Sequence, residues 1–225
     1  MDAFWTTSER ELFKSLKTPG HIQDFLNSLA FNFEERGATC YSPRFAINHK
    51  SAHCMEGAML AAAILEFHGH RPLVLDLRSE AHDFDHVVAV FKQFGCWGAI
   101  SKTNHAVLRF REPVYKTVRE LAMSYFHEYF DSKGRKTLRE YSRLFDLRHF
   151  DRNPIKFPPQ GMGRVRERLR KENWRISDNH LFQIPDYLDK IKHFKILSPP
   201  QIKNLRKADA IEIKAGEIVE YKKTS

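Results

Sequence analysis

The chain has few of the features that define disulfide-rich, zinc-binding or fibrous proteins. Its 225 residues include only three cysteines, Cys40, Cys54 and Cys96, and no two of them form a C-x-x-C pair. An odd number of cysteines without such a pair argues against a disulfide framework and against a structural zinc site. We therefore expect reduced thiols. The 10 glycines and 10 prolines exclude collagen-like and low-complexity sequences.

Long apolar runs are also missing. None approaches the roughly 18 to 20 residues needed to cross a bilayer, and the start lacks a basic segment followed by an apolar one. We therefore expect a soluble, cytoplasmic protein without a membrane partner. The hydrophobic share of 42% and the charged share of 29% are typical of a globular chain, and its length fits one large domain with an appendage.

Positive charge is concentrated in the last third of the chain. The net charge is +9, of which residues 1–150 carry +2 and residues 151–225 carry +7. We predict a main domain over residues 1–150 and a basic C-terminal extension over residues 151–225. Within the extension the pattern predicts a linker at 155–161, a strongly basic helix at 164–171 and a terminal hairpin at 211–221.

Two short helices are predicted near the N-terminus. Ser8-Glu9-Arg10-Glu11 has the spacing of a capping box, and Thr18 precedes a proline that suits the first helical position. After an interruption at Tyr41-Ser42-Pro43, which we read as a loop, the Ala- and Leu-rich residues 54–67 predict a buried helix that stops at Gly69.

Three strands are predicted at 72–77, 86–91 and 97–101, paired consecutively and antiparallel. Pro113 is expected to open a further helix whose aromatic face reaches Tyr129 and enters the core. The predicted fold class is α+β, with the helix at 54–67 packed on a small antiparallel sheet and a helical, basic C-terminal region.

The candidate for chemistry is Cys54 in the first turn of the predicted buried helix. The positive end of a helix dipole stabilises a thiolate, and the backbone N–H groups there are free to stabilise an oxyanion. We expect Ser51 to cap the helix, with Cys54 as its third residue. The alternative is that Cys54 is simply a small buried apolar residue.

A nucleophilic cysteine needs an imidazole within reach and a third group to orient that imidazole. His86 begins an otherwise apolar strand, which would hold its ring rigidly, although it could also be an ordinary core histidine. His82, Asp83, Asp85 and His86, with His49 and His53, lack any recognised metal-ligand spacing, so we predict no metal site.

Three segments in this order resemble the transglutaminase-like superfamily, whose catalytic domain is a variant of the papain-like fold. They are Cys54-Met55-Glu56-Gly57-Ala58 opening the helix, Asp83-Phe84-Asp85-His86-Val87 entering a strand, and Trp97-Gly98-Ala99-Ile100-Ser101-Lys102-Thr103. The resemblance covers roughly residues 44–103. It implies a papain-like core in which Cys54 is the nucleophile and His86 the base.

Ser101 stands where the family normally has an aspartate. A serine can accept a hydrogen bond from the imidazole, but it carries no charge to stabilise an imidazolium. Asn104 is a second candidate for the orienting role. We prefer Ser101, because strand alternation would put Asn104 on the opposite face.

The expected activity is cysteine-dependent hydrolysis of an amide or peptide, or acyl transfer, through a thioester on Cys54. The expected partner is a protein or peptide substrate, and the chemistry requires no metal or organic cofactor. Two alternatives remain: a catalytically degenerate binding or scaffold protein, suggested by Ser101, and a nucleic-acid-associated protein that uses the basic segment at 164–171. The sequence chooses neither between hydrolysis and transamidation nor among oligomeric states.

Overall fold

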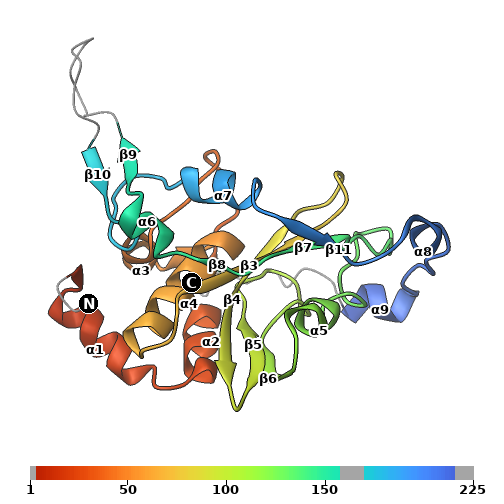
Figure 1. Ribbon diagram of the computed structural model, residues 1–225, viewed down its shortest axis with the longest axis horizontal. Coiled ribbons are helices and arrows are strands. Elements are labelled where there is room, and N and C mark those ends of the chain that lie inside the picture. The colour runs from red at the N-terminus through yellow and green to blue at the C-terminus, as the bar shows by residue number, and fades with distance from the viewer. Residues whose placement is uncertain (1–3, 158–169, 216–225) are drawn as a thin grey trace, which may run out of the picture.

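The fold is built around one antiparallel sheet. The computed structural model describes residues 4–157 and 170–215, and Figure 1 shows them as a mixed α and β structure. Strands in the sheet follow the order β11, β7, β3, β4, β5, β6, and β8 also pairs with β3. Their bounds are β3 Leu73–Arg78, β4 His86–Gln93, β5 Cys96–Ile100, β6 Arg111–Tyr115, β7 Glu140–Ser142, β8 Phe145–Asp146 and β11 His193–Lys195.

The three predicted strands are confirmed as the consecutive antiparallel trio β3, β4 and β5. Leu75 lies opposite Val88, and Val90 lies opposite Ala99. The turn between β4 and β5 places Phe94 at φ 51° and Gly95 at φ 75°. Two successive positive φ angles are typical of the tight hairpin turns whose twist matches that of the flanking strands.

The predicted buried helix is confirmed as α4, Cys54–Phe67, and it packs on one face of the sheet. Val87, Ala89 and Phe91 of β4 share a core with its apolar residues. Also on this side are α1 Thr7–Ser15, α2 Pro19–Ser28 and α3 Pro43–His49, seen around α4 in Figure 1. The short strands β1 Ala30–Phe31 and β2 Ser51–Ala52 pair in parallel just before α4.

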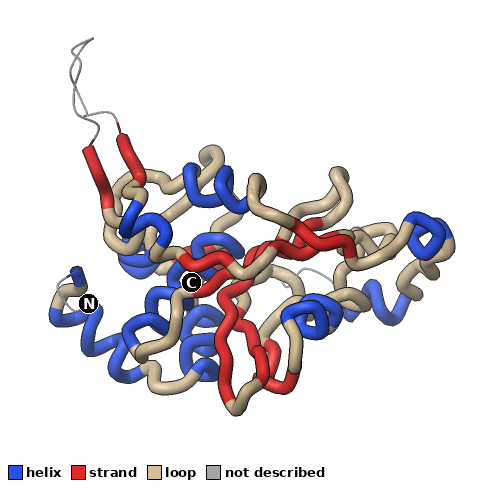
Figure 2. Tube along the Cα trace, in the orientation of Figure 1, coloured by secondary structure: helices blue, strands red, loops and turns tan. Residues whose placement is uncertain are grey.

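The opposite face of the sheet is covered by a second core. Val88 and Val90 meet the apolar side of α5, Val118–Met123, together with Tyr125 and Tyr129. Figures 1 and 2 show the sheet running between α4 on one side and α5 on the other. Both faces of the central strands are therefore buried, as their nearly continuous apolar sequence requires.

One predicted helix start and one predicted loop need correction. In α1 the cap is Thr6, which pairs reciprocally with Glu9, so the capping box lies two residues before the predicted Ser8. The earlier start lets Trp5 pack edge-on against Phe13, with ring centroids 4.8 Å apart. The predicted loop at 41–43 instead contains the cap of α3, because the Ser42 hydroxyl accepts the Phe45 N–H at 3.1 Å.

The helix predicted from Pro113 is also wrong at both ends. Pro113 lies in the edge strand β6, where a residue without an N–H is tolerated. The helix α5 begins five residues later, because Thr117 and Glu120 form its capping box, and it ends at Met123. The aromatic residues that follow, Tyr125 and Tyr129, enter the core as predicted, although from turns.

Residues after 150 contribute to the same core and sheet. Trp174, Leu181 and Ile184 belong to the core around α4. The C-terminal elements are α6 His149–Arg152, β9 Ile155–Phe157, β10 Arg170–Glu172, α7 Gln183–Leu188, β11, α8 Pro199–Lys203 and α9 Ala210–Ala215.

Several C-terminal expectations are overturned. The predicted linker begins as strand β9, which pairs antiparallel with β10. Arg170 and Lys171 lie in β10 and not in a helix; the rest of the predicted basic helix, 164–169, lies outside the described residues. The predicted hairpin begins as helix α9, since Asp209 accepts the N–H groups of Ile211 and Glu212, and its remainder also lies outside them.

Within residues 4–157 and 170–215, no helix combines the length and the apolar character that crossing a membrane would require.

Candidate active site

Cys54 is the first residue of α4, and its N-cap is His53. The prediction that Ser51 caps this helix is therefore wrong. Ser51 belongs to β2 and lies opposite Ala30 of β1, while His53 and Glu56 form the capping box. As the first helical residue, Cys54 presents a backbone N–H that precedes the hydrogen-bonded part of the helix.

His86 and Ser101 are brought together by the pairing of β4 with β5. The His86 ring nitrogen Nε2 lies 2.7 Å from Ser101 Oγ. That hydroxyl donates to the carbonyl oxygen of Leu108, also at 2.7 Å. Because its single proton is used there, Ser101 accepts the hydrogen bond from His86.

The backbone of Ser101 is held by two hydrogen bonds to the side chain of Gln23 in α2. The backbone N–H of Ser101 donates to Gln23 Oε1 at 2.9 Å, and its carbonyl accepts from Gln23 Nε2 at 2.8 Å. Ser101 is fully buried, with 0% of its surface exposed. The position of the hydroxyl that orients His86 is thus fixed by a side chain that the sequence analysis did not single out.

Cys54 faces His86 across one cavity. Its Sγ lies 4.0 Å from the carbonyl oxygen of Asp85, the residue before His86. Cys54 and His86 both line a cavity of about 650 Å³. Since Nε2 of His86 is engaged by Ser101, Nδ1 is the ring nitrogen that remains for the sulfur.

The surroundings favour ionisation of the Cys54 thiol. Burial opposes ionisation, but hydrogen bonds from His53 and His86, together with their charges, outweigh it and lower the pKa of Cys54 to about 5. In contrast, burial raises the pKa of Cys40 well above that of an ordinary thiol. A thiolate at neutral pH is the nucleophilic form of cysteine.

The first turn of α4 and the end of β5 approach each other closely at Gly57. A Cβ added at this position would lie 2.3 Å from the Cβ of Lys102, well inside van der Waals contact. Only glycine leaves room for the Ser101–Lys102 segment here. Gly57 therefore helps to determine how near the orienting hydroxyl comes to the start of the cysteine helix.

The remaining candidates from the sequence have other contacts. Asn104 lines the cavity, whereas the atom on His86 Nε2 is Ser101 Oγ. The Asp85 carboxylate accepts from the Ser79 N–H at 2.7 Å, and Asp83 accepts from the Thr137 hydroxyl. Trp97 packs in the core on the α5 side of the sheet.

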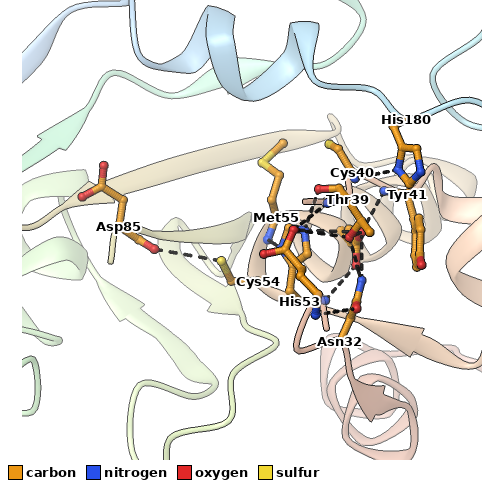
Figure 3. Close-up of polar contacts among 11 residues, drawn as sticks. Asn32, Thr39, Cys40, Tyr41, His53, Cys54, Met55, Asp85 and His180 are labelled. Carbon is orange, nitrogen blue, oxygen red and sulfur yellow. Dashed lines mark hydrogen bonds and ion pairs between the residues drawn. The ribbon is translucent and has the colours of Figure 1, made fainter. Parts of the chain in front are cut away.

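The functional analysis of the sequence missed Glu56, and it weighed His53 only as a metal ligand. The Glu56 carboxylate is completely buried and lies 3.3 Å from His53 Nε2. Figure 3 places Cys54 between Asp85 on one side and the polar cluster around His53 on the other. The signal was present in the sequence as H-x-x-E at 53–56, a capping box with an unusual first residue.

The residues weighed as metal ligands do not gather into one site in the described part of the chain. Among residues 4–157 and 170–215, the one group of three that comes close enough consists of Asp76, Asp85 and Asp189. Asp76 already pairs with His193 at 2.9 Å, and Asp85 accepts from Ser79. The contacts of this group are thus satisfied within the protein.

Comparison with known proteins adds no relative: no protein-family model matches the chain, and no curated protein matches its sequence.

Proposed function

We propose that this protein is a transglutaminase-like cysteine enzyme that attacks an amide or peptide carbonyl and forms a thioester on Cys54. The observation that carries the proposal is the shared cavity of Cys54 and His86, with the His86 ring held by Ser101 at 2.7 Å. A nucleophile, a base and an orienting group are the three parts that this chemistry requires.

In the proposed reaction His86 takes the proton of the Cys54 thiol, and the resulting thiolate adds to the carbonyl carbon and forms a carbon–sulfur bond. The negative charge that develops on the carbonyl oxygen would be stabilised by the backbone N–H of Cys54 at the start of α4. The carbon–nitrogen bond then breaks, and His86 gives a proton to the departing amine or ammonia. Water or a second amine, losing its proton to His86, releases the acyl group.

The shape and lining of the cavity are compatible with a peptide substrate. A volume of about 650 Å³ falls within the range of small-molecule and short-peptide sites. At its rim, Phe84 is 90% exposed and Phe33 is 53% exposed. Exposed aromatic side chains beside a reactive centre provide apolar surface for substrate side chains.

The proposal is tested by trapping the acyl-enzyme. The protein is incubated with a panel of glutamine-containing peptides, with and without a primary amine, quenched in acid and weighed by mass spectrometry. We expect a peptide thioester at Cys54 that is lost in Cys54→Ser and in His86→Ala, but kept in Cys96→Ser. Equal peptide turnover by the protein and by Cys54→Ser, with no adduct, would overturn the proposal.

A binding protein without catalysis is the second candidate, and the neutral Ser101 in the orienting position favours it. Such a protein would retain peptides in the cavity without forming a covalent bond. Peptide binding that survives unchanged in Cys54→Ser, combined with no release of ammonia or new amino termini, would select this alternative.

A further inference from the structure

The site contains two imidazoles, and they have different partners. His86 Nε2 contacts the neutral hydroxyl of Ser101 at 2.7 Å, whereas His53 Nε2 lies 3.3 Å from the buried Glu56 carboxylate. A carboxylate stabilises a protonated imidazole, and a hydroxyl does so much less. The negative charge that the transglutaminase-like family normally places behind the base is therefore behind the other histidine.

Glu56 is arranged as a fixed anion. It accepts hydrogen bonds from the His53 N–H at 2.9 Å, the Tyr41 N–H at 2.9 Å and the Thr39 hydroxyl at 2.7 Å. Asn32 Nδ2 donates to both of its oxygens, at 3.3 and 3.1 Å. This completely buried carboxylate is thus surrounded by hydrogen-bond donors.

We propose that His53 supplies a positive charge that keeps Cys54 ionised, with Glu56 as its counter-ion, while His86 carries the proton that moves during the reaction. The inference rests on the proposed function, because it divides between two residues the work that one histidine performs in a simple triad. His53 acts through Cys54, so it is a positioning residue.

The geometry of the His53 ring gives it two exclusive arrangements. Its Nε2 is 3.2 Å from the Thr39 carbonyl oxygen as well as close to Glu56, so this nitrogen carries a proton. Nδ1 lies 3.3 Å from the Met55 N–H and accepts from it when the ring is neutral. When Nδ1 is protonated it becomes a donor, and its acceptor is then the thiolate of Cys54 at the start of α4.

The ionisable groups around His53 support this assignment. Those facing it are Cys54 and Glu56 on α4 and Glu34 in the loop after β1, whose carboxylate is 3.9 Å from Nε2. Burial lowers the pKa of His53, but the hydrogen bond with Cys54 and the charges of Cys54 and Glu56 outweigh it and raise the pKa to about 9. Tyr129, which follows α5 in the chain, also interacts electrostatically with Cys54. Burial raises the pKa of its phenol well above the ordinary value.

The test is the pH dependence of Cys54 alkylation by iodoacetamide in single variants. His53→Asn removes the charge and keeps a residue well suited to the N-cap. We expect it to move the midpoint of the alkylation profile up by about one to three pH units. His86→Asn is expected to shift the midpoint less, while abolishing thioester formation.

The matched control is His82→Asn. His82 lines the same cavity and also has carboxylates nearby, Glu80 at 3.5 Å and Asp131 at 3.4 Å, so this variant likewise replaces a cavity imidazole that lies beside carboxylates. We expect its alkylation profile to match that of the unaltered protein. A shift as large as that of His53→Asn would overturn the inference, since any cavity histidine would then suffice.

Other outcomes separate this inference from the proposed function. A larger shift in His86→Asn than in His53→Asn overturns the inference and leaves the Cys54–His86 pair intact. A midpoint near that of an ordinary thiol in the unaltered protein overturns both. If His53→Asn does not fold, the ring ¹⁵N shifts of the unaltered protein decide: His53 is expected to stay doubly protonated to about pH 9, and titration near pH 6.5 overturns the inference.

Discussion

His86 Nε2 lies 2.7 Å from Ser101 Oγ, and the same hydroxyl donates its proton to the Leu108 carbonyl oxygen. This direction of hydrogen bonding assigns the tautomer of the neutral His86 ring, with the proton on Nε2 and the lone pair on Nδ1. The lone pair is thus on the nitrogen that remains for Cys54. A neutral hydroxyl can in this way orient the His86 ring by accepting its Nε2 proton in a hydrogen bond, without adding a negative charge beside it.

Ser101→Ala is expected to weaken both folding and chemistry. The substitution leaves the His86 Nε2–H and the Leu108 carbonyl without their partner inside the protein, so the free energy of unfolding falls by about 1 to 3 kcal/mol. Thioester formation slows by up to about 100-fold, because His86 loses its orientation. Urea unfolding and the rate of adduct formation measure the two effects.

Ser142→Ala is the control for this substitution. Ser142 is also fully buried, and its hydroxyl accepts the Asp76 N–H at 3.0 Å in another part of the sheet. Its loss is expected to reduce stability without slowing the formation of the thioester. Equal slowing in both variants would show that Ser101 acts only through the fold.

The three cysteines are expected to differ strongly in reactivity. Cys54 has a pKa lowered to about 5 by hydrogen bonds that outweigh burial, whereas Cys40 is buried and its pKa is raised. Iodoacetamide at neutral pH should therefore label Cys54 first, and peptide mass spectrometry measures the order. Equal labelling of Cys40, Cys54 and Cys96 in the folded protein would contradict the description of the site.

Gly57→Ala is expected to destabilise the protein although alanine is the better helix former. The added methyl would overlap the Lys102 Cβ at 2.3 Å, and relieving such overlap in a packed core costs about 1 to 3 kcal/mol. Gly20→Ala in α2 is the matched control, because its methyl meets only Thr18 Oγ1 at 3.7 Å. Thermal unfolding of both variants decides; a stabilised Gly57→Ala would refute the close approach.

Lys102 is expected to make a contribution to stability that rises with pH in the alkaline range. Its Nζ donates to the carbonyl oxygens of Leu26 at 2.9 Å and Leu29 at 2.6 Å, and burial followed by the charge of Arg109 lowers its pKa to about 8. From about pH 8 to the ordinary value of 10.5 the unfolded chain holds a proton that the folded protein has released, so stability increases.

Lys102→Met removes this ionisable group, so the slope of unfolding free energy against pH between these values should be less positive than in the unaltered protein. Chemical unfolding at several pH values measures the slope in both proteins. Identical slopes would mean that Lys102 keeps its ordinary pKa in the folded state.

The sequence predicted the central helix and three strands because their signals are local. An Ala-rich run at 54–67 and short runs rich in Val and Leu at 72–77 and 86–91 leave few alternatives. Pro113 misled the analysis because a proline suits an edge strand as well as a helix start, and only the pairing of β6 with β5 decides. Non-local pairing of this kind cannot be read from one segment.

The site was predictable in part for the same reason. Cys54, His86 and Ser101 each sit at the end of a recognisable element, and antiparallel pairing of β4 with β5 brings the last two together. Gln23 and Glu56 were missed because their roles depend on contacts with distant segments: Gln23 meets Ser101, 78 residues away, and Glu56 meets the loop before α3.

The most direct test of the account is a spectroscopic titration of the Cys54 thiol. The ultraviolet absorbance of the thiolate is followed against pH, and the curve of Cys54→Ser is subtracted to remove the tyrosines and the other two thiols. We predict a midpoint near pH 5, with the thiolate present throughout the neutral range. A midpoint near 9, the value of an ordinary cysteine, would contradict the account.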